Sequence, residues 1–368
     1  MDSKQSAKQA PVSPEPCLRK PLRVVAMGGG TGLSTLLRGL KSYVLSATEL
    51  AEIHAGSAPA KVCIGELCAV VTVTDDGGSS GRLRKEFNML PPGDIRNCIV
   101  ALSEDEALLS RLFQYRFRGG SGLEGHNLGN LFLTALTEIT GDFSQAVKES
   151  SEILATMGHI YPATTSNVEL EARMEDGTRV RGETKITASK GRIVEIRLVP
   201  PDVSPLPQTL DAIANADLIT VGPGSLFTSL VPNLLVHGIP EAIAASPALK
   251  VYVCNLMTQA NESLGLTAAD HIRALCQHAQ ARIFDYALLN GTPVSDEMKA
   301  KYALEGASQI VNDVEDIEAQ GIHPILGEYL DEGDVARHAA GRVAHDLMRL
   351  AFSSHSEQKE FASQKARR

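Results

Sequence analysis

The sequence lacks the long apolar runs, dense basic stripes and paired cysteines that mark several common classes of protein. No apolar stretch reaches the roughly 20 residues that span a bilayer, so we expect no membrane-spanning segment. The net charge of −9, without a Lys/Arg stripe outside the terminal segments, argues against nucleic acid as the main partner. The six cysteines show no CxxC spacing, which favours reduced thiols in the cytoplasm over a zinc site.

Several nucleotide-binding and catalytic signatures are also missing. The glycine-rich segment 28–32 lacks the third glycine of a dinucleotide-binding GxGxxG motif and the GKS or GKT of a P-loop. No HExxH, EF-hand or protein-kinase pattern occurs, and the serine-containing segment 222–229 holds no G-x-S-x-G elbow. These absences count against NAD binding, Walker-type ATP hydrolysis and a hydrolase triad.

Three apolar runs are each followed by a polar, glycine-rich loop: LRVVAMGGGTG, CAVVTVTDDGGSSG and DLITVGPGSLFTS. Short, continuously apolar runs such as Leu22–Met27 are typical of buried parallel strands. Loops at the carboxyl ends of parallel strands line one crevice, where ligands bind. We therefore expect an α/β protein with a Rossmann-like, mostly parallel sheet, helices on both faces, and a phosphate or nucleotide site at the strand ends.

Hydrophobic periodicity predicts that strands and helices continue to alternate along the chain. Expected strands are Cys68–Thr74, Asp217–Val221, Val251–Leu256 and Phe284–Leu289, and expected helices are Asn127–Leu136, Phe143–Met157, Leu264–Ala279 and Arg337–Ala351. The link Leu45–Leu67 has no clear period and is interpreted as a loop-rich insertion.

Residues 21–352 are expected to form one nucleotide-binding domain with a small antiparallel β excursion at about 167–200. In that excursion, apolar and polar residues alternate through NVELEARMEDGTRVRG and ITASKGRIVEIRLVP, and Asp176-Gly177 is a hairpin turn signal. Residues 1–20 are polar, contain prolines and lack the apolar core of a signal peptide, so a disordered N-terminal tail is expected. Residues 353–368 are expected to be a C-terminal tail.

The first loop is a candidate phosphate site. It consists of Gly28, Gly29, Gly30, Thr31 and Gly32, between the first strand and a predicted helix. Glycines let the backbone approach a ligand closely, and free N–H groups at a helix start favour an anion. The alternative is a tight turn without a ligand.

The second loop carries two neighbouring carboxylates, Asp75 and Asp76. Such a pair can hold Mg²⁺, accept hydrogen bonds from ligand hydroxyls or act as a base. Helix capping is the alternative, and the sequence favours neither over the other. Beside the carboxylates, Gly78, Ser79 and Ser80 are candidate donors to phosphate oxygens.

Basic side chains follow the second loop at once. Arg82, Arg84 and Lys85 could neutralise a diphosphate, or they could form an exposed helix face. Further candidate ligand contacts at predicted helix starts and strand ends are Asp94, Arg96, Asn97, His126, Asn127, Asn130, Gly224, Ser225 and Asn255. The histidine could donate to a phosphate or act as a general acid, but a structural hydrogen-bonding role is favoured.

The loops GGGTG, TDDGGSSGRLR, PPGDIRN, GHNLGN, GPGSLFTSLVPNLL and YVCNLMTQ together resemble those of the YvcK-like gluconeogenesis factor family, from about Leu22 to Val311. That family is related to the CofD-like 2-phospho-L-lactate transferases. The resemblance implies a Rossmann-like fold, self-association and a nucleotide-diphosphate site at the strand ends. It carries the site onto Gly28 to Gly32, Asp75, Asp76, Asp94, Asn97, Asn127, Asn130, Gly224, Ser225 and Asn255. It also implies an aromatic ring near position 266, where this chain has Leu266.

The resemblance implies one of two functions. In the first, a cytoplasmic regulatory protein without catalysis binds a UDP-sugar such as UDP-N-acetylglucosamine. It acts with cell-wall synthesis proteins, and it maintains cell shape during gluconeogenic growth. In the second, a transferase uses Mg²⁺ and a guanosine-diphosphate-linked lactyl phosphate, with Asp75 and Asp76 as metal ligands. A scaffold that binds no ligand is a third reading, because fold alone does not define function.

Overall fold

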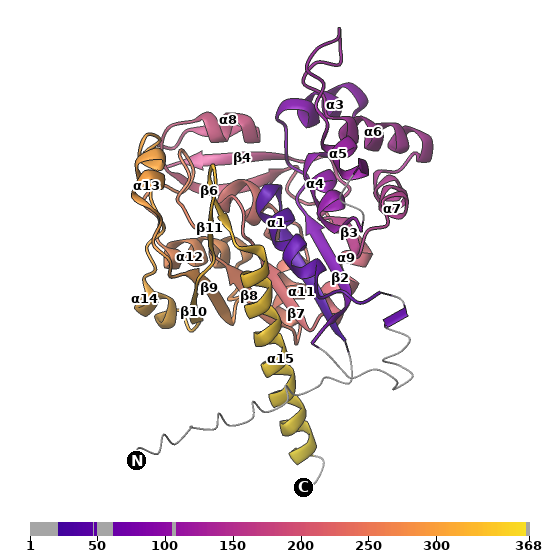
Figure 1. The fold of residues 1–368 in the computed structure, drawn as a ribbon. Helices are drawn as coiled ribbons and strands as arrows, with labels where there is room; N and C mark the ends of the chain where they lie inside the picture. Colours follow the sequence, from indigo (N-terminus) through magenta and orange to yellow (C-terminus); the bar gives the residue numbers. More distant parts are fainter. Residues whose placement is uncertain (1–20, 47, 50–61, 105–107, 366–368) are drawn as a thin grey trace, which may run out of the picture.

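The core of the protein is a seven-stranded parallel sheet (Figure 1). The structure is a computed structural model that describes residues 21–46, 48–49, 62–104 and 108–365. The strand order is β10-β9-β8-β7-β1-β2-β3. The strands are β1 (Leu22–Gly28), β2 (Ile64–Val71), β3 (His159–Pro162), β7 (Leu218–Val221), β8 (Leu249–Val253), β9 (Tyr286–Asn290) and β10 (His323–Gly327). Their nearly continuous apolar sequences fit strands that are covered on both faces.

Helices cover both faces of this sheet, as the sequence predicts. One group packs around α1 (Gly30–Lys41) and includes α4 (Gly93–Leu102) and α15 (Ala340–Lys365). The other group is α9 (Pro207–Asn215), α10 (Val231–Leu234), α11 (Ile239–Ala245), α12 (Ala268–Ala279) and α14 (Val314–Ala319). The remaining helices are α3 (Gly78–Phe87), α5 (Leu108–Gln114), α6 (Leu128–Thr140), α7 (Phe143–Ile153) and α13 (Asp296–Ala303).

A small antiparallel sheet confirms the β excursion expected near residues 167–200. Its central strand β4 (Glu169–Met174) lies between β5 (Arg179–Arg181) and β6 (Ile193–Val199). The alternating pattern around Ile186 predicts a strand, but the structure has the short helix α8 (Glu183–Ala188) there. Ile186 is the buried residue of that helix, so a single apolar side chain holds α8 against the core.

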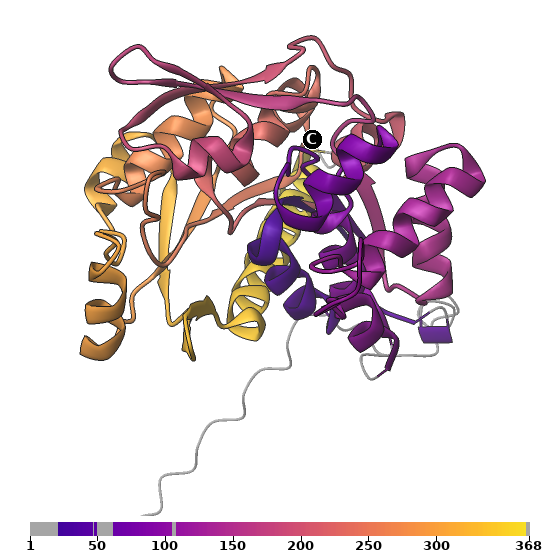
Figure 2. The same cartoon turned by 90° about the horizontal axis from the view of Figure 1, so that it is seen from above.

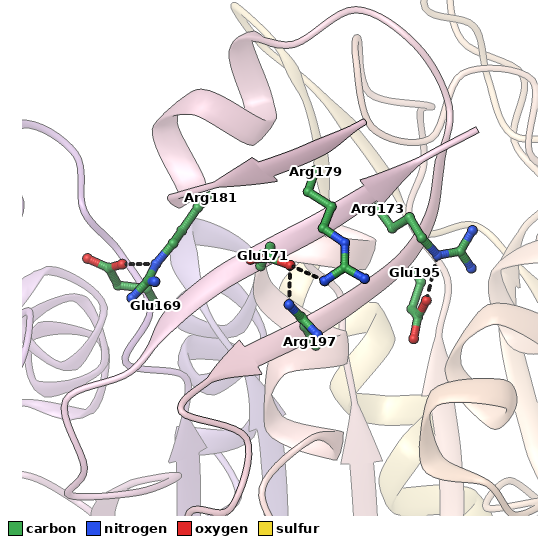
Figure 3. A network of polar contacts seen from close by, with 7 residues as sticks. All are labelled: Glu169, Glu171, Arg173, Arg179, Arg181, Glu195 and Arg197. Carbon is green, nitrogen blue, oxygen red and sulfur yellow. Dashed lines mark hydrogen bonds and ion pairs between the residues drawn. The ribbon is translucent and has the colours of Figure 1, made fainter. Parts of the chain in front are cut away.

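One face of the small sheet is apolar and the other is charged. Leu170, Ala172, Ile196 and Leu198 are buried. The opposite face carries a ladder of ion pairs (Figure 3): Glu169 with Arg181, Glu171 with Arg179 and Arg197, and Arg173 with Glu195. Exposed pairs of this kind each contribute at most about 1 kcal/mol, so the ladder mainly keeps the outer face polar.

Some element boundaries differ from the sequence prediction. Strand β2 covers Ile64–Val71, four residues earlier than the expected start at Cys68, because it pairs along the full length of β1. Helix α15 continues to Lys365 and so includes most of the segment expected as a C-terminal tail. The expected N-terminal tail and most of the Leu45–Leu67 insertion lie outside the described residues.

None of the described helices alone combines the length and apolar composition needed to cross a membrane. The bent pair Leu226–Leu234 and Ile239–Ala245 meets those two criteria only when its two helices are taken together.

Candidate functional site

The main cleft lies at the switch point of the sheet, where β1 has β2 on one side and β7 on the other. The strand order reverses there, and this is where open α/β sheets bind ligands. The cleft has a volume of about 480 Å³, within the range of small-molecule sites. Of the sequence candidates, it brings together Gly29, Gly30, Thr31, Gly32, Gly224, Ser225 and Asn255.

The first loop leaves the start of α1 open toward the cleft. Gly29 takes the N-cap position without a side-chain capping bond, and Gly30 has a left-handed φ of 63°. A Cβ on Gly29 would lie 2.5 Å from Thr72 Cγ2, and one on Gly32 would lie 2.3 Å from the Pro223 carbonyl oxygen. Glycine is therefore required here by close packing. The Gly30 amide is engaged by the Asp94 carboxylate, and Gly29 has no side chain to cap the Thr31 and Gly32 amides, which can meet an anion.

The loop after β7, residues 222–229, is called the fourth loop here, and polar side chains from the segment that follows β8 brace it. The Asn255 side chain accepts from the Gly224 amide at 3.0 Å and donates to the Gly224 carbonyl oxygen at 2.7 Å. The Gln259 amide donates to Ser225 Oγ at 2.9 Å. Asn255, expected from the sequence to recognise a base or sugar, thus also shapes the loop.

A carboxylate that the sequence did not single out accepts hydrogen bonds from the amides at the start of η1 (Leu226–Leu230), a short π-helical turn. Glu262 Oε1 accepts from the Phe227 and Thr228 amides at 2.7 and 3.0 Å. Burial raises the pKa of Glu262, while these hydrogen bonds oppose the shift. This carboxylate fills the place where a phosphate would meet the fourth loop. At the first loop the Asp94 carboxylate engages the Gly30 amide, so the Thr31 and Gly32 amides are the ones left for an anion.

An aromatic side chain on the cleft wall also escaped sequence analysis. Tyr302 of α13 lines the cleft, whereas Leu266 packs against the core. His338 of β12 (Ala336–His338) lines the cleft too, and its Nε2 lies 2.9 Å from the Cys254 carbonyl oxygen. Burial lowers the pKa of His338 to about 4, so the ring is neutral at physiological pH. Tyr302 lies 36 residues beyond Leu266, and only the packing of α13 brings it to the cleft.

The second loop uses its two aspartates as hydrogen-bond acceptors for backbone. Asp75 Oδ1 accepts from the Gly77 amide at 2.9 Å, just before α3. Asp76 Oδ1 accepts from the Thr184 amide at 2.8 Å and from Thr184 Oγ1 at 2.6 Å. Asp76 therefore holds the first turn of α8, 108 residues away in the chain.

Carboxylates crowd together behind this loop. Burial and the nearby Asp75 raise the pKa of Asp94 to about 6. A hydrogen bond donated by the Gly30 amide and the charge of Arg96 oppose the shift. Burial, followed by Asp75, Asp94 and Asp76, raises the pKa of Glu183 to about 9. Within the described part of the chain, no group of three or more His, Cys, Asp or Glu side chains has the geometry to hold a metal ion.

Several other candidates form a buried hydrogen-bond network around the start of α6. Ser79 Oγ lies 3.1 Å from His126 Nδ1 and accepts from the Asn127 amide at 3.2 Å. Asn130 Nδ2 donates to Ser80 Oγ at 3.4 Å. Residues 77–81 match G-x-S-x-G by spacing, but Ser79 is only 3% exposed and its oxygen is engaged by this network. The geometry gives these side chains structural contacts and places none of them in the cleft.

The basic residues after the second loop do not face the cleft. Arg84 is buried and donates to Asn167 Oδ1 and to the Val168 carbonyl oxygen. Arg82 donates to the Glu124 carbonyl oxygen at 2.9 Å. In this structure Arg82 and Arg84 bond neighbouring segments and do not line the cleft, and a role as diphosphate partners stays a prediction.

The parallel sheet, its switch point and the glycine-lined cleft define a Rossmann-like α/β protein. A family model described as 2-phospho-L-lactate transferase CofD matches residues 24–330, and the chain belongs to this family. The gluconeogenesis factor of Halalkalibacterium halodurans is 48% identical over 330 residues, covering 89% of this chain and 96% of that protein. The gluconeogenesis factor of Bacillus subtilis is 46% identical over 329 residues, covering 89% and 98%.

A solved structure supports the same assignment. A crystal structure of a protein from Bacillus halodurans superposes with a TM-score of 0.82 at 46% sequence identity, covering 89% of this chain and 99% of that one. The resemblance to the gluconeogenesis factors and the Rossmann-like fold inferred from the sequence are both confirmed.

Proposed function

We propose that the cleft binds a nucleotide-diphosphate sugar such as UDP-N-acetylglucosamine and that the protein is a regulatory binding protein. The observation that carries the proposal is the pairing of two features in one cleft. The first turn of α1 offers the Thr31 and Gly32 amides to the diphosphate, and the Tyr302 ring offers a stacking surface to the base. With Glu262 filling the fourth loop, the phosphates are assigned to the first loop and the neutral groups of Ser225 and Gln259 to sugar hydroxyls.

The chemistry of the cleft supports binding over catalysis. Among the described residues that line it, His338 is neutral and held by a backbone oxygen, Glu262 is committed to two amides, and Glu305 is exposed just after α13. The name of the similar proteins, gluconeogenesis factor, supports a role in growth on gluconeogenic carbon. In this proposal the loaded protein acts in the cytoplasm on partners in cell-wall precursor synthesis and so helps to maintain cell shape.

One observation favours the transferase alternative, which the matched family model also suggests. Asp75, Asp94 and Glu183 form a cluster of carboxyl groups whose mutual repulsion raises the pKa values of Asp94 and Glu183, and a divalent cation would favour their ionised forms. Mg²⁺ often takes only one or two carboxylates and completes its shell with water and substrate phosphates. Of the two aspartates in the second loop, Asp75 would supply such a ligand, because Asp76 is engaged by the Thr184 amide and hydroxyl of α8.

A calorimetric titration with UDP-N-acetylglucosamine, repeated with GDP and Mg²⁺, tests both readings. We expect saturable binding of the UDP-sugar without turnover. Tyr302→Ala should weaken it by roughly 5- to 160-fold, since stacking on a base contributes about 1–3 kcal/mol. Tyr302→Phe keeps the ring and should bind normally.

The opposite preference would overturn the regulatory reading. Stronger binding of GDP with Mg²⁺, together with nucleotide release from a guanosine-diphosphate donor and a deazaflavin acceptor, would establish the transferase. Asp75→Asn should then abolish that release while the variant stays folded. Absence of any nucleotide binding at millimolar concentration would reject both readings.

A further inference from the structure

A second hollow lies at the end of the parallel sheet opposite the cleft. Lys250 near the start of β8, Tyr286 at the start of β9 and His323 at the start of β10 line it, and its volume is about 390 Å³. The three strands run parallel, so these residues meet at the amino ends of the strands. We call this space the amino-end hollow.

Three basic side chains line the amino-end hollow against a single carboxylate. The basic residues are Lys250, Arg282 and His323, and the acid is Asp285. Within the described part of the chain, none of the three basic side chains forms an ion pair or a side-chain hydrogen bond. Asp285 Oδ2 instead accepts from the Lys250 amide at 2.9 Å, so this carboxylate is engaged by the β8 backbone. The hollow therefore has an excess of uncommitted basic donors, which an anion would stabilise.

The wall of the amino-end hollow holds these groups in place. Gly321, just after α14, has a left-handed φ of 76°, and a Cβ at this position would collide with Arg282 Nη1. The missing side chain thus leaves room for the guanidinium group. The Tyr286 and His323 rings lie side by side, with their centroids 5.3 Å apart. Ser354 of α15 adds a hydroxyl group to the wall.

The amino-end hollow is separate from the cleft. Among the described residues, none lines both spaces. Lys250 lies near one end of β8, and Asn255, which lines the cleft, follows the other end. The strand between them is about 13 Å long at about 3.3 Å per residue, so a phosphate group bound at one end of β8 does not reach the other.

We propose that the amino-end hollow binds a phosphate-bearing small molecule. The Arg282 guanidinium group can meet phosphate oxygens through paired, charge-assisted hydrogen bonds, and the Lys250 ammonium group adds a point charge. The His323 ring and the Ser354 hydroxyl group supply further donors. The proposal goes beyond the nucleotide-sugar function, because it concerns a second ligand at the other end of the sheet.

The test measures the binding of inorganic phosphate to the full-length protein by calorimetry. The variants are Arg282→Ala, Arg282→Glu and Lys250→Gln, and far-UV circular dichroism checks that each one is folded. Arg192→Ala and Arg192→Glu are matched controls, because Arg192 is exposed and lies outside the hollow. We expect saturable binding that weakens about tenfold in Arg282→Ala and Lys250→Gln, weakens further in Arg282→Glu, is unchanged in the controls and falls with added salt.

A second arm locates the bound phosphate by amide hydrogen exchange. We expect phosphate to slow exchange in residues 281–285 and 320–323 of wild type and to lose this effect in Arg282→Glu. Neither arm uses a nucleotide-sugar, so both remain decisive if the proposed function of the cleft fails.

Four results would each overturn the proposal. These are no saturation at millimolar phosphate, equal losses in the Arg192 controls, unchanged affinity in both Arg282→Ala and Lys250→Gln, and protection confined to residues 29–32. The last result would place the phosphate in the cleft.

Discussion

Glu183 has a strongly perturbed carboxyl group, although it lies outside every loop that the sequence singles out. Its pKa rises to about 9 because it is partly buried and faces Asp75, Asp94 and Asp76. The folded protein therefore holds this proton more tightly than the unfolded chain, whose glutamate titrates near 4.5. The stabilisation is complete below pH 4.5 and is lost as the pH rises toward 9.

Glu183→Gln should remove this pH dependence, because the amide imitates the protonated side chain. We expect the variant and wild type to unfold at similar temperatures near pH 4.5 and the variant to become progressively more stable than wild type up to pH 9. Thermal unfolding followed by circular dichroism across that range measures the difference. Glu318→Gln, at an exposed position, is the control. Parallel curves for Glu183→Gln and wild type would contradict the assigned pKa.

At the scale of elements, α8 and the small sheet pack on the core through buried apolar side chains, and polar contacts to strand-end loops and to α12 hold them as well. Asp76 holds the first turn of α8, the Asn261 side chain donates to the Thr187 carbonyl oxygen at 3.2 Å, and the Ile196 amide donates to His278 Nε2 at 3.2 Å. In Figures 1 and 2 the small sheet reaches across one side of the molecule above the strand ends. Since Thr187 lines the cleft, α8 forms part of its wall.

Asp76→Ala should loosen α8 without unfolding the protein. A hydrogen bond to a charged group contributes about 1.5–3 kcal/mol, so we expect amide hydrogen exchange in residues 183–188 to accelerate by a factor of ten or more. Thr184→Ala should give a smaller effect that is not additive with Asp76→Ala, because both remove the same contact. Glu195→Ala, in the exposed ladder, is the control and should leave this exchange unchanged. Unaltered exchange in Asp76→Ala would show that the anchor is unimportant.

For the whole molecule, one continuous sheet joins the two sides of the cleft. β1 pairs with β2 on one side and with β7 on the other, and the loops after β1, β7 and β8 line the cleft. Helix α15 packs closely on α1, where a Cβ on Gly39 would lie 2.2 Å from the Ala340 carbonyl oxygen. The late part of the chain therefore supports the helix whose first turn lines the cleft (Figure 1).

This architecture predicts that the parallel sheet unfolds as one cooperative unit and that a cleft ligand stabilises all of it. At a UDP-N-acetylglucosamine concentration of 100 times its Kd, we expect the free energy of unfolding to rise by about 2.7 kcal/mol. Far-UV circular dichroism and tyrosine absorbance should report the same shift in Tm. A ligand-dependent shift in only one of two separate transitions would contradict the prediction.

The local features of the site could be predicted from the sequence. Apolar runs such as Leu22–Met27 identify buried strands, and the glycines after them identify strand-end loops, because both signals depend on neighbouring residues alone. The first loop, the Gly224 loop and Asn255 were placed at one cleft by this reasoning, and the structure brings them together. The family resemblance rested on the same loops, and the comparisons confirm it.

Contacts between distant segments could not be predicted in this way. Glu262 fills the fourth loop, Asp76 caps a helix 108 residues away, and Tyr302 reaches the cleft from α13. Three basic side chains from separate segments meet in the amino-end hollow, although the sequence shows no basic cluster there. The sequence alone determined the strand-and-loop pattern, which follows from local hydrophobicity and backbone freedom. The tertiary structure alone decided which charges meet, because that depends on how the helices pack against the sheet.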